Sequence, residues 1–305
     1  MAASRTWIDW LGLAALVLMW GSAFAAIKFV VGAVGPYWLA AIRLAVAAML
    51  MVGFAAVARV RLPRGGAEWF AVSVIGVAGT AMPFFLINWS SQFVASGIAG
   101  LMMAANPFLV LALSLVLLPE EKATRLRVAG LVVGFAGVAM VISGSTDTDF
   151  SSVGGFLPYL ALLLASGGYA VNAVVGRRVA GIPPLTRAYG SLLTASAAAV
   201  PLALLVEPFP FALPAQAWAG VLYLAVLPTW AAALLMYFII DRTSAGFFAQ
   251  SNYLVPAAAV LFGALLYAEQ LHPMHYLGFA VILAGIALAE ARWSRSTRPP
   301  VLPSA

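Results

Sequence analysis

The feature that most constrains this chain is a series of apolar stretches, each long enough to cross a membrane. A spanning helix needs about 20 mostly apolar residues to cross a lipid core about 30 Å thick. Hydrophobic residues make up 64% of the 305 positions and charged residues only 9%. A soluble protein of this size cannot bury so much apolar surface. The alternating strands of a transmembrane barrel are not found, so the sequence predicts an all-α membrane protein.

Ten spanning helices fit the apolar runs and the Gly-, Pro- or charge-containing loops between them. We expect these helices at residues 8–30, 37–58, 68–90, 94–118, 125–143, 154–176, 184–206, 217–240, 246–267 and 275–292. The segment 293–305 is polar and Pro-rich, and we expect it to form a disordered cytoplasmic tail.

Basic residues are distributed unevenly between the two sides that ten helices define. Fourteen of the 16 Lys and Arg residues fall on the side of both termini, namely Arg5, Arg59, Arg61, Arg64, Lys122, Arg125, Arg127, Arg177, Arg178, Arg187, Arg242, Arg292, Arg295 and Arg298. Lys28 alone falls on the other side, and Arg43 lies inside the second helix. Cytoplasmic loops carry the excess of Lys and Arg in membrane proteins. The sequence therefore predicts that both termini are cytoplasmic.

An internal repeat relates the fourth and ninth expected helices. Matching residues stand 149 positions apart in four pairs, namely Trp69 and Trp218, Gly97 and Gly246, Pro107 and Pro256, and Glu120 and Glu269. Because the two helices stand five crossings apart in the chain, they traverse the membrane in opposite directions. Inverted five-helix halves are an architecture of secondary transporters, which bind substrate near the midplane. We expect one half at 1–146 and the other at 147–292, around a central cavity.

Several short motifs resemble the EamA-type members of the drug/metabolite transporter superfamily. They are Trp20-Gly21-Ser22 with Phe24 and Lys28, Pro36 with Arg43, the Pro-Glu pair at 119–120 and the glycine-rich helix at 125–143. The resemblance covers about residues 10–290 and is closest to the amino-acid exporters of bacterial inner membranes. It implies that helices 1–4 and 6–9 surround the cavity and that helices 5 and 10 lie outside. The second half departs from the pattern, because it has no counterpart to Trp20-Gly21 or to Arg43.

Residues near the middle of the expected helices are the candidates for lining a substrate cavity. A polar side chain within hydrocarbon is costly unless it faces protein or water. The candidates are Trp20, Ser22, Arg43, Thr80, Asn88, Met102, Asn106, Pro107, Tyr169, Asn172, Trp230, Tyr237, Gln250, Asn252, Tyr253 and Pro256. Polar groups also hold neighbouring helices together in membranes, and the sequence leaves both roles open.

Two features in this set have alternative interpretations. Pro107 and Pro256 leave backbone carbonyls unbonded, which could receive a substrate ammonium beside Asn106 or simply kink the helix. Arg43 could bind a substrate carboxylate through its planar fork, or it could snorkel or pair with a carbonyl and hold the bundle together. Lys28 lies nearer the surface, and we expect it at the solvated end of the first helix.

Neither an enzyme nor an ATP-driven pump is expected. His272 and His275 are the only histidines, cysteine is absent, and no phosphate-cradling glycine loop is found. We therefore expect no metal and no cofactor. The positive charge lies in membrane-flanking loops, so nucleic acid is not an expected partner. No Asp or Glu falls near the bilayer centre, where ion-coupled carriers commonly place one, which favours facilitated diffusion or weak coupling.

The sequence favours an alternating-access exporter of small amphipathic metabolites in the bacterial inner membrane. Amino acids, including aromatic and hydrophobic ones, are the first expectation for its substrate. A drug or other metabolite exporter of the same fold is the alternative, and a membrane-embedded enzyme is the alternative from another class. The expected partners are a small-molecule substrate and the lipid bilayer. Glycine faces in helices 5 and 10 let helices approach closely, within a monomer or in a homodimer.

Overall fold

The computed structural model describes residues 6–118, 121, 123–144 and 155–290 of an all-helical protein. Five crossings are single long helices, namely α1 (Trp7–Val34), α2 (Pro36–Val57), α7 (Arg125–Ser143), α8 (Leu157–Arg178) and α9 (Pro184–Val206). Four further crossings consist of consecutive helical pieces. The third is α3 (Gly65–Gly76), η1 (Val77–Ala81) and α4 (Met82–Ser90), and the fourth is α5 (Ser96–Met102), η2 (Met103–Ala105) and α6 (Asn106–Leu117). The eighth is α10 (Ala215–Leu224), η3 (Ala225–Ala231) and α11 (Ala232–Arg242), and the ninth is α12 (Ala245–Phe248) with α13 (Ser251–Tyr267). The last crossing is α14 (Pro273–Glu290).

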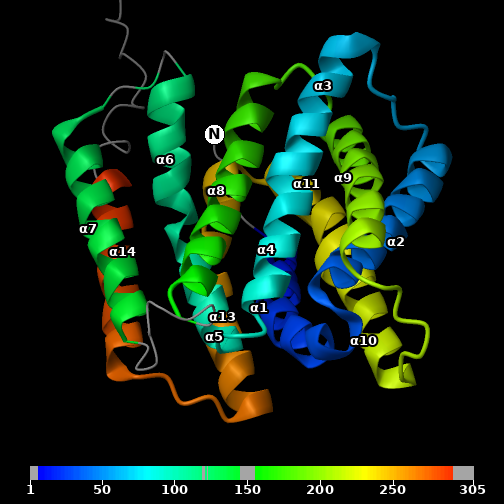
Figure 1. The fold of residues 1–305 in the computed structure, drawn as a ribbon. Coiled ribbons are helices and arrows are strands. Elements are labelled where there is room, and N and C mark those ends of the chain that lie inside the picture. The colour runs from blue at the N-terminus through cyan, green and yellow to red at the C-terminus, as the bar shows by residue number, and fades with distance from the viewer. Residues whose placement is uncertain (1–5, 119–120, 122, 145–154, 291–305) are drawn as a thin grey trace, which may run out of the picture.

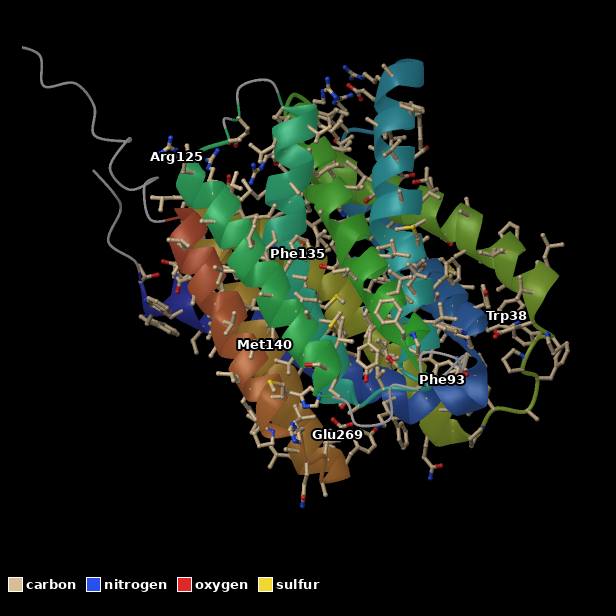
Figure 2. The ribbon with its side chains drawn as sticks, turned by 60° about the vertical axis from the view of Figure 1, so that its left-hand side comes forward. Trp38, Phe93, Arg125, Phe135, Met140 and Glu269 are labelled. Atoms are coloured by element: carbon tan, nitrogen blue, oxygen red, sulfur yellow. The ribbon has the colours of Figure 1, made fainter. Side chains whose placement is uncertain are left out.

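Among the described residues, nine crossings are long and apolar enough to span a membrane, and α14 is a shorter apolar helix. The ten predicted spans are therefore confirmed, with edges that differ by a few residues. Figure 2 shows Arg125 and Glu269 near opposite ends of the bundle. We call these the Arg125 end and the Glu269 end. Glu120, the half boundary at 146–147 and the tail at 293–305 lie outside the described residues, as do Arg5, Lys122, Arg292, Arg295 and Arg298.

Eight of the crossings pack into a ring in which the two halves of the chain alternate (Figure 1). Going round the ring, α1 contacts α10, α2 contacts the π-helical turn η3 and α9, α9 contacts α3, and α4 contacts α8. The ring continues from α8 to α6, and it closes from α5 through α13 back to α1. Each segment thus packs against two segments from the other half. The fold depends on contacts between the halves as much as on contacts within them.

The α5–α13 contact shows that the two repeated segments run in opposite directions. Ser96, at the start of α5, lies beside Gly263 near the end of α13. Gly100, one turn further along α5, packs against Ala259, one turn further back along α13. This antiparallel pairing is the arrangement predicted for two crossings that stand five apart in the chain, with four crossings between them.

Helices α7 and α14 pack along each other at one side of the ring (Figure 1). Glycines make this contact close, since a Cβ at Gly137 would lie 2.7 Å from the carbonyl oxygen of Gly278. Gly134 instead faces the ring of Phe108 on α6, which fastens the pair to the ring of eight. The glycine faces predicted in helices 5 and 10 are therefore used within one chain.

The repeat is also visible in two wide, π-helical turns. Val77–Ala81 and Ala225–Ala231 contain Thr80 and Thr229, which stand 149 residues apart. Each threonine hydroxyl donates to the carbonyl five residues earlier, at 3.1 Å for Thr80 and 2.7 Å for Thr229. Such turns are rare and are frequently found at functional sites. Their matching positions indicate that both halves of the duplication retain the π-helical turn, although few side chains match between the halves.

Prolines account for the freed carbonyls at these turns. A proline has no N–H, so the carbonyl four residues earlier loses its helical donor. Pro228 deprives Leu224 in this way, and the Thr229 hydroxyl replaces the missing donor. Pro83 deprives Gly79, whose carbonyl lies 3.4 Å from the Asn172 side-chain nitrogen. Both π turns thus face polar side chains in the interior of the bundle.

Candidate functional site

A recess of about 510 Å³ lies between the two halves. Its walls come from α1 of the first half and from α10 and α13 of the second, through Ser22, Ala25, Ala26, Phe29, Tyr223, Phe262, Leu266 and Tyr267. It extends from Ser22, near the middle of α1, to Tyr267 at the Glu269 end of α13. Small-molecule sites have volumes of about 300–1,000 Å³ and mostly apolar walls with a few polar groups. The recess has these properties.

The polar groups of the recess belong to a network that joins α1 to the second half. The hydroxyls of Ser22 and Tyr223 lie 2.5 Å apart. Two residues before Ser22, the Trp20 indole donates to the carbonyl of Pro228 at 3.2 Å, within η3. These contacts tie the middle of α1 to the π-helical turn of the opposite half.

Arg43 on α2 reaches the same turn from its other side. Its side chain is only 5% exposed, and its Nε donates to the Thr229 hydroxyl at 2.6 Å. The guanidinium carbon lies 4.0 Å from the centre of the Phe84 ring on α4, within the range of a cation–π contact. The phenols of Tyr169 on α8 and Tyr223 on α10 lie within electrostatic range of the guanidinium. Arg43 therefore neither snorkels to the surface nor bonds a backbone carbonyl.

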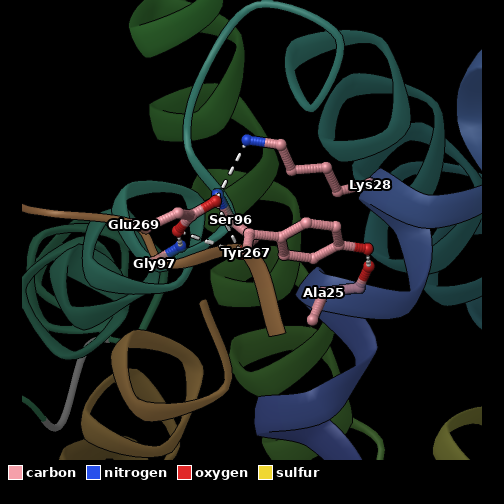
Figure 3. A network of polar contacts seen from close by, with 6 residues as sticks. All are labelled: Ala25, Lys28, Ser96, Gly97, Tyr267 and Glu269. Atoms are coloured by element: carbon pink, nitrogen blue, oxygen red, sulfur yellow. Dashed lines mark hydrogen bonds and ion pairs between the residues drawn. The ribbon is translucent and has the colours of Figure 1, made fainter. Parts of the chain in front are cut away.

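Glu269 forms a second polar cluster at its end of the molecule (Figure 3). Its carboxylate accepts from the backbone N–H groups of Ser96 at 2.8 Å and Gly97 at 2.9 Å, and from Lys28 at 3.0 Å. Burial raises the pKa of Glu269, but the donors from Gly97, Ser96 and Lys28 outweigh it and hold the pKa below its usual range. Lys28, expected at the solvated end of the first helix, is 33% exposed, and its ammonium is also paired with Glu269.

At the Arg125 end, α1 is joined to α11 and α12. Asp9 accepts from Arg242 at 3.0 Å, and Trp10 meets the buried Phe247 edge to face at 5.0 Å between ring centres. Near the Glu269 end, α1 is joined to α13 by the Lys28–Glu269 pair and by the Tyr267 hydroxyl, which donates to the Ala25 carbonyl at 2.9 Å. Beside the recess, Val30 of α1 packs closely against Gly220 of α10. Both ends of α1 are thus held against the second half.

The structure separates the sixteen sequence candidates into groups. Trp20, Ser22, Arg43 and Tyr169 gather around η3 and the recess. Asn88 and Met102 are fully buried, and the Asn88 amide donates to the Pro36 carbonyl, which ties α4 to α2. Thr80 and Asn172 donate side-chain hydrogen bonds to backbone carbonyls at the η1 turn. The remaining candidates near the Arg125 end of the second half are Tyr237, Gln250, Asn252 and Tyr253.

The other candidates occupy the middle of their crossings. Asn106 and Pro107 begin α6 directly after the 3₁₀ turn Met103–Ala105, so the crossing is interrupted there. The Asn106 Oδ1 and the Trp230 Nε1 are buried without a hydrogen-bond partner. Pro256 lies buried inside a continuous α13. The proline at 107 therefore marks a break, whereas its repeat partner does not.

Sequence reasoning missed Thr229 and Tyr223 as members of the site. Thr229 could have been found, because it matches Thr80 at the repeat distance of 149 residues and follows a mid-helix proline. Tyr223 carried no such signal, and only its contact with Ser22 places it at the site.

The ten crossings, the antiparallel repeat and the recess between the halves define a multi-pass helical membrane protein with the architecture of secondary transporters. The sequence profile described as the EamA-like transporter family matches residues 6–143 and again 156–290. The chain belongs to this family of transporters, which is not a family of enzymes. The double match agrees with two repeats.

Individual relatives are distant but cover nearly the whole chain. A "Probable terminal-alkyne amino-acid exporter" of Streptantibioticus cattleyicolor is 26% identical over 277 residues, or 90% of this chain and 91% of the relative. The "Uncharacterized inner membrane transporter YedA" of Escherichia coli K12 is 25% identical over 294 residues, or 95% and 94%. A solved crystal structure with 22% identity has a TM-score of 0.67 and covers 96% of this chain and 100% of its own, which shows the shared fold.

Proposed function

We propose that this protein is an alternating-access exporter of small amphipathic metabolites, with apolar and aromatic amino acids as its first substrate class. The observation that carries the proposal is the recess, because its walls come from both halves and combine aromatic surface with three hydroxyls. A site built between two halves changes its exposure when one half moves against the other. The relative from Streptantibioticus cattleyicolor is named as a probable terminal-alkyne amino-acid exporter, which supports this substrate class.

The contacts at the two ends of α1 are the ones that alternating access would change. At the Arg125 end, α1 is held by the Asp9–Arg242 ion pair and the Trp10–Phe247 contact, and at the opposite end by the Lys28–Glu269 ion pair. A carrier that exposes its site to one side at a time opens one end while the other end stays closed. We propose that opening toward the Arg125 end breaks the Asp9–Arg242 pair.

We propose that transport is facilitated diffusion or exchange. The acidic residues whose positions the structure describes lie at or near helix ends, namely Asp9, Glu68, Glu121, Glu207, Asp241, Glu269 and Glu290. A proton relay at mid-membrane commonly uses a carboxylate. A pH gradient alone is therefore not expected to drive uphill accumulation in proteoliposomes.

Counterflow in proteoliposomes with a panel of labelled amino acids tests the proposal. We expect uptake of aromatic and apolar amino acids, and we expect Ala26→Trp, which fills the recess, to abolish it. The matched control is Ala14→Trp, an exposed position on the same helix outside the recess. Flat signals for all amino acids, with uptake of drugs or other metabolites instead, would favour the alternative exporter. Equal uptake by wild type and Ala26→Trp would contradict the role of the recess.

We also propose that the protein lies in the bacterial inner membrane with the Arg125 end in the cytoplasm. The chain has no cysteine, so single cysteines can report orientation in whole cells. Gln270→Cys at the Glu269 end should react with an impermeant maleimide, and Ala123→Cys at the Arg125 end should not. The opposite labelling pattern would contradict the orientation.

A further inference from the structure

Arg43 is a charged group whose counter-ion is missing from the described part of the chain. It is 95% buried, two turns into α2 from Pro36. The acids in the described ion pairs are Asp9, Glu68, Glu121 and Glu269, and none of them reaches Arg43. Burying an isolated charge costs far more than one neutral hydrogen bond returns. A guanidinium retained there without an acid points to an anion that arrives from outside the protein.

The free donors of Arg43 are its two terminal nitrogens. Only Nε makes a hydrogen bond with a described residue, the one to Thr229. The Arg187 Nε and the Trp230 Nε1 are fully buried without a hydrogen-bond partner among the described residues, but the two terminal nitrogens of Arg43 are not. The two Arg43 nitrogens therefore retain some accessible surface. Two parallel N–H donors of one guanidinium match the two oxygens of a carboxylate.

The backbone holds this fork in place before any ligand binds. Pro228 leaves the Leu224 carbonyl without its helical donor, and the Thr229 hydroxyl donates to it at 2.7 Å. The Thr229 oxygen is thereby turned to accept from Arg43 Nε. The Phe84 ring lies against one face of the guanidinium. Both contacts fix the plane of the fork, which lowers the entropy lost on binding.

The recess is connected to this group through α10. Tyr223 on α10 lines the recess, and its hydroxyl lies 2.5 Å from the Ser22 hydroxyl. Thr229, which accepts from Arg43, lies in the η3 turn that directly continues α10. Arg43 thus bonds the same crossing that forms one wall of the mostly apolar recess.

We propose that Arg43 is the substrate-carboxylate site of this transporter and that it selects monocarboxylates with an apolar or aromatic body. The inference rests on the proposed transport function and narrows its substrate class. A phosphate dianion calls for more than one cation, and Lys28 is already paired with Glu269. At the repeat distance of 149 residues, the position of Arg43 corresponds to Leu192 in the second half, so the repeat supplies no second arginine there.

Ligand pairs that differ only in the carboxylate test the proposal without any mutation. Binding of L-phenylalanine, L-phenylalaninamide and 3-phenylpropionate to the purified full chain is measured by the change in thermal midpoint with ligand concentration. We expect wild type to bind the two carboxylates roughly 10- to 100-fold more tightly than the amide, the range of a charge-assisted hydrogen bond. Equal affinities for acid and amide would overturn the proposal.

Variants then assign the discrimination to Arg43. Arg43→Gln should bind acid and amide equally, and Arg43→Lys should recover only part of the preference because it lacks the fork. Arg178→Gln, the same change at the exposed end of α8, should keep the preference of wild type. A fall in affinity for acid and amide alike in Arg43→Gln would mean that Arg43 only supports the fold. Should Arg43→Gln fail to fold, Thr229→Val keeps the charge, frees the fork, and should reduce the acid preference.

The outcomes separate this proposal from the transport proposal. Amino-acid counterflow with no acid preference leaves the exporter standing and overturns the role of Arg43. Tight binding of 3-phenylpropionate that Arg43→Gln abolishes, without amino-acid counterflow, supports the carboxylate site and removes amino acids as the substrate.

Discussion

Replacing Glu269 by glutamine tests how the Glu269 end of the bundle is held together. The carboxylate is 8% exposed and accepts two backbone N–H groups, the Ser96 hydroxyl and Lys28. Glutamine keeps the shape but replaces one acceptor oxygen with an NH₂ donor. Whichever way the amide turns, the N–H of Ser96 or of Gly97 then faces another donor.

The magnitude follows from these contacts. A buried donor left unpaired costs about 1–3 kcal/mol. The lost ion pair adds less than about 1 kcal/mol, because Lys28 is partly exposed and can rehydrate. We therefore expect Glu269→Gln to lower the free energy of unfolding by about 1–4 kcal/mol, and Lys28→Met to lower it by at most about 1 kcal/mol.

Unfolding in detergent micelles, followed by tryptophan fluorescence, measures both variants, with the exposed Gln270→Ala as control. The pKa of Glu269 is lower in the folded state, so its stabilisation is complete above the unfolded pKa of about 4.3. It is lost as the pH falls through the folded value. The gap between wild type and Glu269→Gln should be constant from pH 7 to about 5 and should close in stronger acid. A cost for Lys28→Met equal to that of Glu269→Gln would refute the reasoning, because the ion pair would then dominate.

Three further changes test the packing. Gly134→Leu would drive a side chain into Phe108, and we expect a loss of at least about 1–3 kcal/mol of unfolding free energy together with separation of α7 from α6, visible as faster hydrogen exchange in α7. Trp20→Phe removes the donor to the Pro228 carbonyl and should lower the free energy of unfolding by about 1 kcal/mol in the same assay. An unchanged free energy of unfolding would contradict this prediction. Ala268 has a φ of +51°, so Ala268→Gly should raise the thermal midpoint by relieving about 1 kcal/mol of strain, and a lower midpoint would contradict this.

Much of the fold could be predicted from the chain because the lipid bilayer imposes strong rules. Only segments of sufficient apolar length can cross, so ten spans and their approximate edges follow from the sequence. The repeat distance of 149 residues and the odd offset of five crossings gave the opposite directions of α5 and α13. The glycines of helices 5 and 10 predicted close packing, though not whether the partner helix belongs to the same chain.

What the sequence could not decide is which way each side chain faces. In lipid the outside of a bundle is as apolar as its core, so hydrophobic periodicity carries little information about orientation. Asn88 and Arg43 look alike in the sequence as buried polar residues, yet the amide of Asn88 bonds the Pro36 carbonyl, whereas Arg43 uses only its Nε to bond a described residue. The chain by itself determined the spans and the repeat. Only the tertiary structure brought Arg43 to the crossing that contains Tyr223 and Thr229, because Arg43 lies far from them in sequence and meets that crossing where the two halves alternate.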